Sequence, residues 1–333
     1  MTRVAVMGTG SWGTTFAVVL ADAGAQVTMW GRRAEVCAEI TGAHRNSTYL
    51  GDLPLPESVT ATVDPAQALH RAELVVLGVP SQTLRANLLA WGGHIPATAA
   101  LVSLAKGVEL GTLLRMTEVV REVLGVPDER IAVVSGPNLA KEIAVRQPTA
   151  TVVASADLDV ADRVAQACSA PYFRPYTQTD VIGVELGGAV KNVIALAVGI
   201  AEGMGFGDNT KASIITRGLA ETTRLGLALG AEPATMAGLA GLGDLVATCA
   251  SPLSRNRTFG AHLGSGLSVE QTVAITRQTA EAVKSCGPIL ELARRHGIEM
   301  PITEQVVAVV HEGLPVTEMA PRLLGRPRKS ELA

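Results

Sequence analysis

Lys191 stands in the middle of an apolar segment, ELGGAVKNVIALAVGIA, that covers residues 185–201. This segment predicts a wholly buried helix, and an ammonium group without a partner is costly to bury in a protein core. Burial also lowers the pKa of a lysine, so Lys191 would exchange protons near neutral pH. In the alternative interpretation, its side chain reaches the surface or pairs with Glu185. Lys191 is therefore a candidate proton donor and acceptor.

A glycine motif, GTGSWG at residues 8–13, directly follows the first predicted strand and opens a helix. Gly8 allows the tight turn, Gly10 allows a diphosphate to approach the backbone, and Gly13 allows close packing of helix and strand. The N–H groups at the helix start would bind the diphosphate. A glycine turn used only for packing is the alternative. Because the motif lies at the first strand of an alternating chain, we predict dinucleotide binding.

The end of the second predicted strand indicates which dinucleotide fits. NAD enzymes place an acidic residue here for the ribose 2′-hydroxyl, whereas this chain has Arg32 and Arg33 and no acid before Glu35. Two guanidinium groups suit a 2′-phosphate, although a basic surface loop would have the same sequence. We expect NADP(H) to be used at least as well as NAD(H).

Two further loops follow predicted strands, at the edge where open α/β sheets bind ligands. Lys106 comes just after the strand at 100–104, within reach of such a ligand. Gly136 and Asn138 follow the strand at 131–135 and start a helix whose N–H groups would hold polar ligand atoms. Lys141, beside Glu142, is interpreted as a surface residue of that helix.

In the second half of the chain, Asp244 ends a tight glycine turn, GLGD at 241–244. Ser254 is of the type that caps helices, and Arg255 and Asn256 after it offer donors for a phosphate. Each of these residues also fits an ordinary helix start, with Asp244 as a cap and Arg257 as a surface charge.

The elements that must position these residues fall into two parts. Up to about residue 178, amphipathic helical stretches alternate with short β-branched runs at 4–7, 26–30, 59–62, 74–79, 100–104, 131–135 and 149–154. This alternation predicts an α/β fold with a Rossmann-type, doubly wound, mostly parallel sheet. From 181 to 324 the pattern is helical. We therefore expect a dinucleotide-binding domain at 1–179 and an all-α substrate domain at 180–333.

The composition excludes several classes of protein. A net charge of -3 without long basic runs, and only 3% aromatic residues, argue against nucleic-acid binding. The four cysteines are scattered, which fits reduced thiols in a cytoplasmic protein and no metal site. No uncharged apolar run has the length of about 18 residues that a membrane span needs. A strand pattern begins at once, so no signal peptide is expected.

Together, these segments resemble one family, the bacterial NAD(P)-dependent glycerol-3-phosphate dehydrogenases, from residue 8 to about residue 327. The resemblance implies reversible hydride exchange between NAD(P)H and dihydroxyacetone phosphate, which gives sn-glycerol 3-phosphate for phospholipid synthesis. It also supports a homodimer. The segments that carry it are GTGSWGT at 8–14, SLAKGVE at 103–109, SGPNLAKE at 135–142, VELGGAVKNVIALAVGIAEGMGFGDNTKASIITRGLAE at 184–221, GLAGLGDLVATC at 238–249 and SRNRTFG at 254–260.

The resemblance also implies a role for individual residues. Lys191 is similar to the family's general acid/base, and Lys106 to a contact of both substrate and cofactor. The implied substrate pocket comprises Lys106, Gly136, Asn138, Lys191, Asp244, Ser254, Arg255 and Asn256. The implied cofactor contacts are Gly8, Gly10, Ser11, Trp12, Gly13, Arg32, Arg33, Lys106, Ala140, Arg255, Thr279 and Glu281. The chain departs from the family pattern at Thr279-Ala280, Ala282 and Lys284-Ser285.

Two other interpretations stay open. A β-hydroxyacid-type dehydrogenase with a catalytic lysine would have the same layout, but its substrates carry a carboxylate, and this pocket offers donors for a phosphate. A non-catalytic dinucleotide-sensing protein would keep the glycine turn without needing a buried Lys191 together with Asp244.

Overall fold

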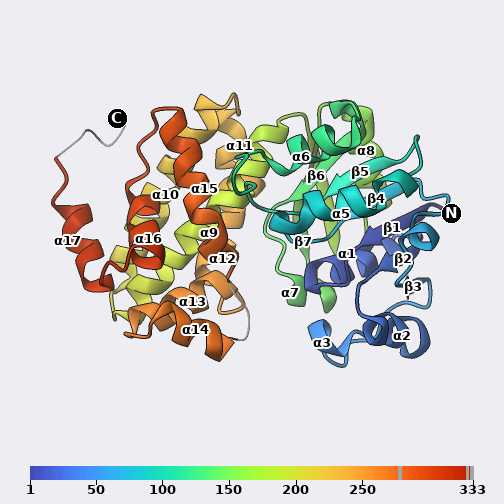
Figure 1. Cartoon of the computed structure of the whole chain (residues 1–333), viewed down its shortest axis with the longest axis horizontal. Helices are drawn as coiled ribbons and strands as arrows, with labels where there is room; N and C mark the ends of the chain where they lie inside the picture. Colours follow the sequence, from blue (N-terminus) through green and yellow to red (C-terminus); the bar gives the residue numbers. More distant parts are fainter. Residues whose placement is uncertain (277–279, 328–329, 331–333) are drawn as a thin grey trace.

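The computed structural model describes residues 1–276, 280–327 and 330. It has two lobes side by side, an N-terminal lobe built on a β-sheet and a C-terminal lobe built of helices (Figure 1). The change from strands to helices falls between β8 (Phe173–Gln178) and α9 (Val181–Gly203). The division into two domains at residue 179 stays a prediction.

The N-terminal lobe contains one eight-stranded sheet in the order β3-β2-β1-β4-β5-β6-β7-β8. The first six strands are parallel, β7 is antiparallel to β6, and β8 is parallel to β7. The order reverses between β1 and β4, which is where open α/β sheets bind ligands. The bounds of these strands are β1 Arg3–Met7, β2 Gln26–Trp30, β3 Val59–Thr62, β4 Leu74–Leu77, β5 Ala100–Ser103, β6 Ile131–Ser135 and β7 Thr149–Ser155.

The predicted doubly wound, mostly parallel sheet is therefore confirmed, with one strand missed. The missed strand is β8, whose sequence FRPYTQ contains a proline and partly exposed polar residues. Such a sequence is tolerated at the edge of a sheet, where one side of the strand has no partner.

Helices cover both faces of the sheet, and each face has its own hydrophobic core. Neighbouring residues of β1 point to opposite faces, so Val4 and Val6 join one core and Ala5 and Met7 join the other. The helices of this lobe are α1 Ser11–Asp22, α2 Ala34–Ala43, α3 Ser47–Leu50, α4 Pro65–Leu69, α5 Leu84–Trp91, α6 Met116–Leu124, α7 Ala140–Ala144 and α8 Leu158–Ala167, with single 3-10 turns at Ser81–Thr83, Gly92–His94 and Asp128–Arg130.

The C-terminal lobe packs its helices around α9. Small residues let α13 approach closely, since a Cβ at Gly199 would lie 2.0 Å from the Arg257 carbonyl oxygen and one at Gly260 would lie 2.1 Å from that of Leu196. This contact brings the start of α13 near the middle of α9. The other elements are α10 Asp208–Ala228, α11 Pro233–Ala237, the π-helical turn η4 Leu239–Gly243, α12 Asp244–Ala250, α13 Arg255–Gly264, α14 Val269–Thr276, α15 Glu281–Arg295, α16 Pro301–His311, a 3-10 turn at Val316–Glu318 and α17 Met319–Leu324.

Among the described helices, α9 has the length and apolar composition of a membrane span, and 89% of its most apolar window is buried inside the protein. The segments Pro233–Ala250 and Arg255–Gly264 meet the same criteria only when a bend of 49° between them is ignored. A buried core helix explains the apolar sequence of α9.

Candidate active site

Lys191 lies in the centre of α9 and is buried, as its apolar neighbours predict. Its ammonium group donates hydrogen bonds to Asp244 Oδ1 and, over 2.8 Å, to Thr248 Oγ1. Both partners belong to α12, in the same lobe. The alternative that Lys191 pairs with Glu185 is wrong, because the Glu185 carboxylate binds Arg115 and Thr117 instead.

Asp244 joins two lysines from the two lobes. Lys106, which follows β5, donates to Asp244 Oδ2 over 2.6 Å and to the Gly136 carbonyl oxygen over 3.2 Å. The close contact of α9 with η4 makes this possible, since a Cβ at Gly187 would come within 2.4 Å of the Ala240 carbonyl oxygen. The carboxylate itself is 1% exposed. One buried carboxylate therefore faces two ammonium groups.

The electrostatic environment makes Lys191 a suitable proton carrier. Burial lowers its pKa to about 8, Asp244 opposes that shift, and the nearby charge of Lys106 adds to it. A lysine in this range loses and regains its proton close to neutral pH, as general acid–base catalysis requires.

The loop after β6 supplies polar atoms beside Lys106. Gly136 has φ of +137°, which favours glycine, and its Cβ position would lie 3.3 Å from Thr151 Cα. Asn138 donates to Thr151 Oγ1 over 3.0 Å, while its Oδ1 and the Ser135 hydroxyl are buried without a partner in the protein. Unpaired buried polar atoms are rare in proteins, and these two fit a polar ligand.

The start of α13 contacts α9 at Asn192, the residue after Lys191. Ser254 caps the helix, because its Oγ accepts a hydrogen bond of 3.2 Å from the Arg257 N–H. Asn256 is buried, donates to Asn192 Oδ1 over 2.8 Å and accepts from the Ala282 N–H over 3.0 Å. Arg255 is exposed at the first helical position.

One of the alternative interpretations for this region is wrong. Arg257 is not a mere surface charge, because it is partly buried and its guanidinium lies 2.6 Å from Glu202 Oε1. Lys141, by contrast, is an exposed residue of α7, as the sequence indicated.

Four residues of the site were not predicted, namely Ser135, Thr151, Asn192 and Thr248. Asn192 had a signal of its own, since it is a polar residue directly after Lys191 in a largely apolar helix. Thr248 lies four residues after Asp244, a spacing that places two side chains on one helix face. Ser135 and Thr151 carried no such signal.

The glycine loop after β1 has the geometry of a diphosphate site. Gly8 has φ of +136° and packs against Gly78, and a Cβ at Gly13 would lie 2.7 Å from the Gly8 carbonyl oxygen. A Cβ at Gly10, however, would meet no atom within 4 Å. Packing therefore explains two of the three glycines, and the third fits the close approach of a ligand. No side chain caps the start of α1, so its first N–H groups suit an anion.

The structure places the other predicted cofactor residues around this lobe and the start of α15. Ser11 and Trp12 begin α1, and Trp12 packs on Phe16 with ring centres 5.5 Å apart. Arg32 and Arg33 are exposed after β2, and the Arg33 guanidinium lies 5.4 Å over the Tyr49 ring. Ala140 begins α7, Glu281 begins α15, and Thr279 lies outside the described residues.

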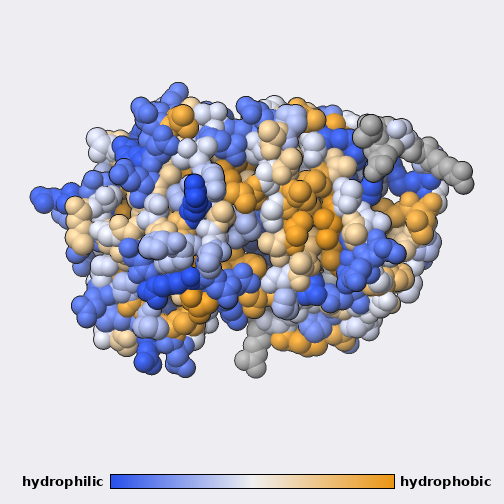
Figure 2. Space-filling view, turned by 180° about the vertical axis from the view of Figure 1, so that it is seen from behind, coloured by the Kyte–Doolittle hydropathy of each residue, from blue (hydrophilic) through white to orange (hydrophobic). Residues whose placement is uncertain are grey.

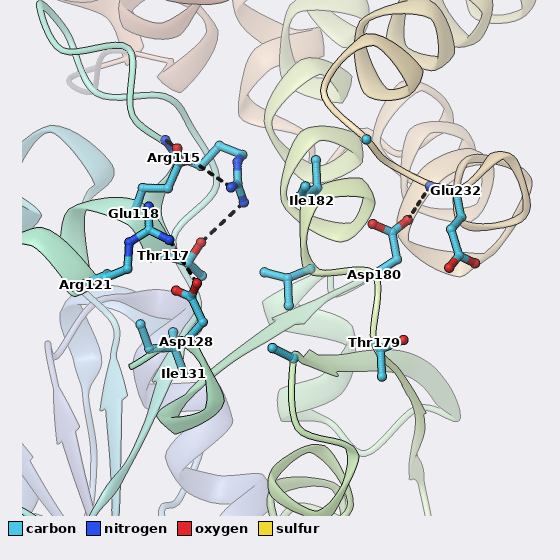
Figure 3. Close-up of a pocket in the computed structure, with 13 residues that line it drawn as sticks. Arg115, Thr117, Glu118, Arg121, Asp128, Ile131, Thr179, Asp180, Ile182 and Glu232 are labelled. Carbon is cyan, nitrogen blue, oxygen red and sulfur yellow. Dashed lines mark hydrogen bonds and ion pairs between the residues drawn. The ribbon is translucent and has the colours of Figure 1, made fainter. Parts of the chain in front are cut away.

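A separate cavity of about 440 Å³ lies between the lobes, at the N-terminal end of α9 (Figure 3). Arg115 and Thr117 line it from the N-terminal lobe, and Asp180 lines it from the start of α9. Asp180 caps α9 through the Gly183 N–H and accepts a second hydrogen bond, of 2.8 Å, from the Glu232 N–H. The two active-site lysines do not line this cavity.

Comparisons with known proteins agree with this geometry. Residues 3–161 match the family model for the N-terminus of NAD-dependent glycerol-3-phosphate dehydrogenase, and residues 180–321 match the model for its C-terminus. A glycerol-3-phosphate dehydrogenase (NAD(P)+) of Streptomyces griseus is 64% identical over 99% of this chain and 98% of its own length. One of Thermobifida fusca with the same name is 61% identical over 99% of both chains.

Solved structures are similar over the same length. The crystal structure of glycerol-3-phosphate dehydrogenase from Coxiella burnetii has a TM-score of 0.93 and 37% identity, over 98% of this chain and 99% of that chain. A ketopantoate reductase from Ralstonia eutropha, at 18% identity, has a TM-score of 0.61 over 96% of this chain and 100% of its own. The second similarity concerns the fold alone.

Proposed function

The chain belongs to the family of NAD-dependent glycerol-3-phosphate dehydrogenases, and we propose that Lys191 is the proton carrier of its reaction. The protein is an NAD(P)-dependent oxidoreductase that interconverts dihydroxyacetone phosphate and sn-glycerol 3-phosphate, the precursor of glycerophospholipids. One observation supports this role for Lys191. The Asp244 carboxylate accepts hydrogen bonds from both Lys191 and Lys106, and it thereby holds the two ammonium groups together at the edge of the sheet.

Reduction of a ketone needs one hydride and one proton. NAD(P)H, when bound, supplies the hydride. Lys191 donates the proton to the carbonyl oxygen, and in the reverse direction the neutral amine takes the hydroxyl proton. Asp244 fixes the direction of the Lys191 ammonium, while Lys106 stabilises the negative charge that develops on the substrate oxygen. A pKa of about 8 keeps both forms of Lys191 accessible.

The start of α13 would bind the substrate phosphate. Arg255 offers a guanidinium, Asn256 lies beside Asn192 next to the catalytic lysine, and the helix contributes its positive N-terminal end. Ser254, Gly136 and Asn138 complete the proposed pocket. Such an array favours a dianionic phosphate over the single carboxylate of a β-hydroxyacid.

The N-terminal lobe would hold the dinucleotide. The diphosphate would lie against Gly10 and the uncapped start of α1. Arg32 and Arg33 are exposed at the end of β2, where a ribose 2′-phosphate would lie. We therefore propose that NADP(H) is used at least as well as NAD(H).

An assay of dihydroxyacetone phosphate reduction with NADPH and with NADH tests substrate, reaction and cofactor together. We expect turnover with both cofactors and a kcat/KM for NADPH at least equal to that for NADH. Oxidation of 3-hydroxyisobutyrate serves as the control for the β-hydroxyacid alternative. If the folded protein binds NADPH but does not oxidise it with dihydroxyacetone phosphate, the assignment is wrong.

We also propose a homodimer in the cytoplasm. Hydrophobic side chains gather on the back of the helical lobe (Figure 2), and the family resemblance supports a dimer. Cys37, Cys168, Cys249 and Cys286 are buried free thiols, which fits a reducing compartment. A molar mass measured by light scattering in solution tests the dimer, and a mass of 34.5 kDa would contradict it.

A further inference from the structure

We propose that Asn46 is a positioning residue for the cofactor diphosphate, because it fixes the peptide between Thr9 and Gly10. The inference rests on the proposed use of NAD(P)(H). It concerns a residue that lies outside the glycine motif, 37 positions after Thr9.

Asn46 donates both of its amide hydrogens to the glycine loop and the start of α1. The residue is 0% exposed, and its Nδ2 donates to the Thr9 carbonyl oxygen over 3.0 Å and to Thr14 Oγ1 over 2.8 Å. The Thr14 hydroxyl in turn donates to the same Thr9 oxygen over 3.2 Å. The carbonyl therefore accepts two hydrogen bonds, one for each of its lone pairs.

These bonds determine where the next N–H group points. In a trans peptide the C=O and the N–H lie in one plane and point in opposite directions. The described part of the chain has no cis peptide, and the Thr9 carbonyl is turned inward to Asn46 and Thr14. The Gly10 N–H is therefore turned away from Asn46 and Thr14, and a Cβ at Gly10 would meet no atom within 4 Å, so the backbone there has room for a ligand.

A purely local role does not explain the Asn46 side chain. Asn46 precedes α3, but it makes no side-chain capping bond there. Its backbone carbonyl, rather than its side chain, accepts from the Tyr49 and Leu50 N–H groups. The Asn46 Oδ1 is buried without a partner, which is costly unless the amide is needed for its donors. What the side chain contributes is thus the two bonds to the loop.

Binding of two cofactor fragments to the full-length chain tests this role. ADP-ribose contains the diphosphate, whereas adenosine 2′-phosphate lacks it. We expect Asn46→Ala and Thr14→Val each to raise the Kd for ADP-ribose by about tenfold, and to leave the Kd for adenosine 2′-phosphate within about twofold. Thr14→Ser keeps the hydroxyl and should bind both fragments like the parent chain.

An equal loss of affinity for both fragments would overturn the proposal, since the network would then only hold the lobe together. Unchanged affinity for ADP-ribose in folded variants would overturn it as well. The melting temperature shows whether Asn46→Ala folds. If it does not, Thr14→Val provides the test, because valine has nearly the same shape as threonine. If the parent chain does not bind ADP-ribose, the cofactor assignment itself is wrong, and so is the role proposed for Asn46.

Discussion

Two buried ionic clusters lie on the same helix, six residues apart, and they have opposite composition. Around Glu185, one cation, Arg115, binds two carboxylates, those of Glu185 and Glu118. Around Lys191, one carboxylate, that of Asp244, binds two ammonium groups. Both clusters join the two lobes, but they differ in whether the protein and the solvent balance their excess charge.

The cluster at Glu185 is satisfied within the protein. Burial raises the pKa of Glu185, while Arg115 and two hydrogen bonds from Thr117, at 2.7 and 2.9 Å, oppose that shift. The Thr117 N–H belongs to the first turn of α6, whose positive end also favours the carboxylate. Glu118 is partly exposed, so water shares the second negative charge. This arrangement is suited to fixing the position of one lobe relative to the other.

The cluster at Lys191 keeps its excess positive charge. Its other protein acceptors are the Gly136 carbonyl oxygen and the Thr248 hydroxyl, both of them neutral. An anionic substrate would therefore supply the missing charge. Burial of charge is therefore not itself a sign of catalysis. What distinguishes the cluster at Lys191 is that its excess charge is buried without a further charged partner, beside polar atoms that fit a ligand.

The largest effect is expected from Lys191. Lys191→Ala should lower kcat by roughly 1,000-fold or more, because the proton donor is lost, while cofactor binding and folding stay nearly unchanged. Lys191→Arg should fail too, since arginine does not release its proton at working pH. Steady-state kinetics with a parallel thermal melt measure both effects. Near-normal kcat in the folded Ala variant would remove Lys191 from the mechanism.

Glu185→Ala should have the opposite profile. It leaves the buried Arg115 without its main partner and is expected to lower the free energy of unfolding by about 3–5 kcal/mol. In the protein that remains folded, the pH at which kcat changes should stay that of the parent. Glu118→Ala is the matched control, because its carboxylate is partly exposed and the loss of its ion pair and of its bond to the Arg115 N–H should cost only about 1–2 kcal/mol. Denaturant unfolding measures the free energy of unfolding of each variant. If Glu185→Ala and Glu118→Ala lower it equally, the Glu185 pair is not the stronger of the two.

Asp244→Asn tests the shared carboxylate. We expect kcat to fall by roughly 100-fold, because both lysines lose a charged partner. Since Asp244 opposes the lowering of the Lys191 pKa, the pH at which kcat changes should also move downward. A pH profile at the parent position would show that Asp244 does not set the Lys191 pKa.

The smallest effect is expected at the edge of the site. Arg255→Ala removes a proposed phosphate contact and should raise the KM for dihydroxyacetone phosphate by about tenfold, with a smaller change in kcat. Lys141→Ala, on an exposed face of α7, is the control for loss of a surface charge. An unchanged KM in Arg255→Ala places the phosphate elsewhere.

The sequence predicted the parts of this comparison that depend on local pattern. The alternation of strands and helices, the burial of α9 and the glycine loop all follow from residue types and spacing. The partners of the buried charges do not. Asp244 lies 53 positions from Lys191 within the C-terminal lobe, and Glu185 lies 70 positions from Arg115 in the other lobe, so only tertiary packing brings the members of each pair together.

Residues without a chemical signature were missed for the same reason. Asn46 stands in an ordinary loop sequence, and its role depends on the return of the chain to the glycine motif. The strand β8 was missed because its pattern is polar and contains a proline, although β7 offers it a partner. The role of Asn46 and the formation of β8 both depend on tertiary contacts, and the local periodicity of a sequence does not reveal such contacts.

The most direct test of Lys191 as the proton carrier is the pH dependence of kcat in both directions, from about pH 6 to about pH 10. Lys191 must be protonated to reduce dihydroxyacetone phosphate and neutral to oxidise glycerol 3-phosphate. With a pKa of about 8, reduction should fall and oxidation should rise as the pH increases through that value. Rates that stay flat across this range in both directions would contradict Lys191 as the proton carrier.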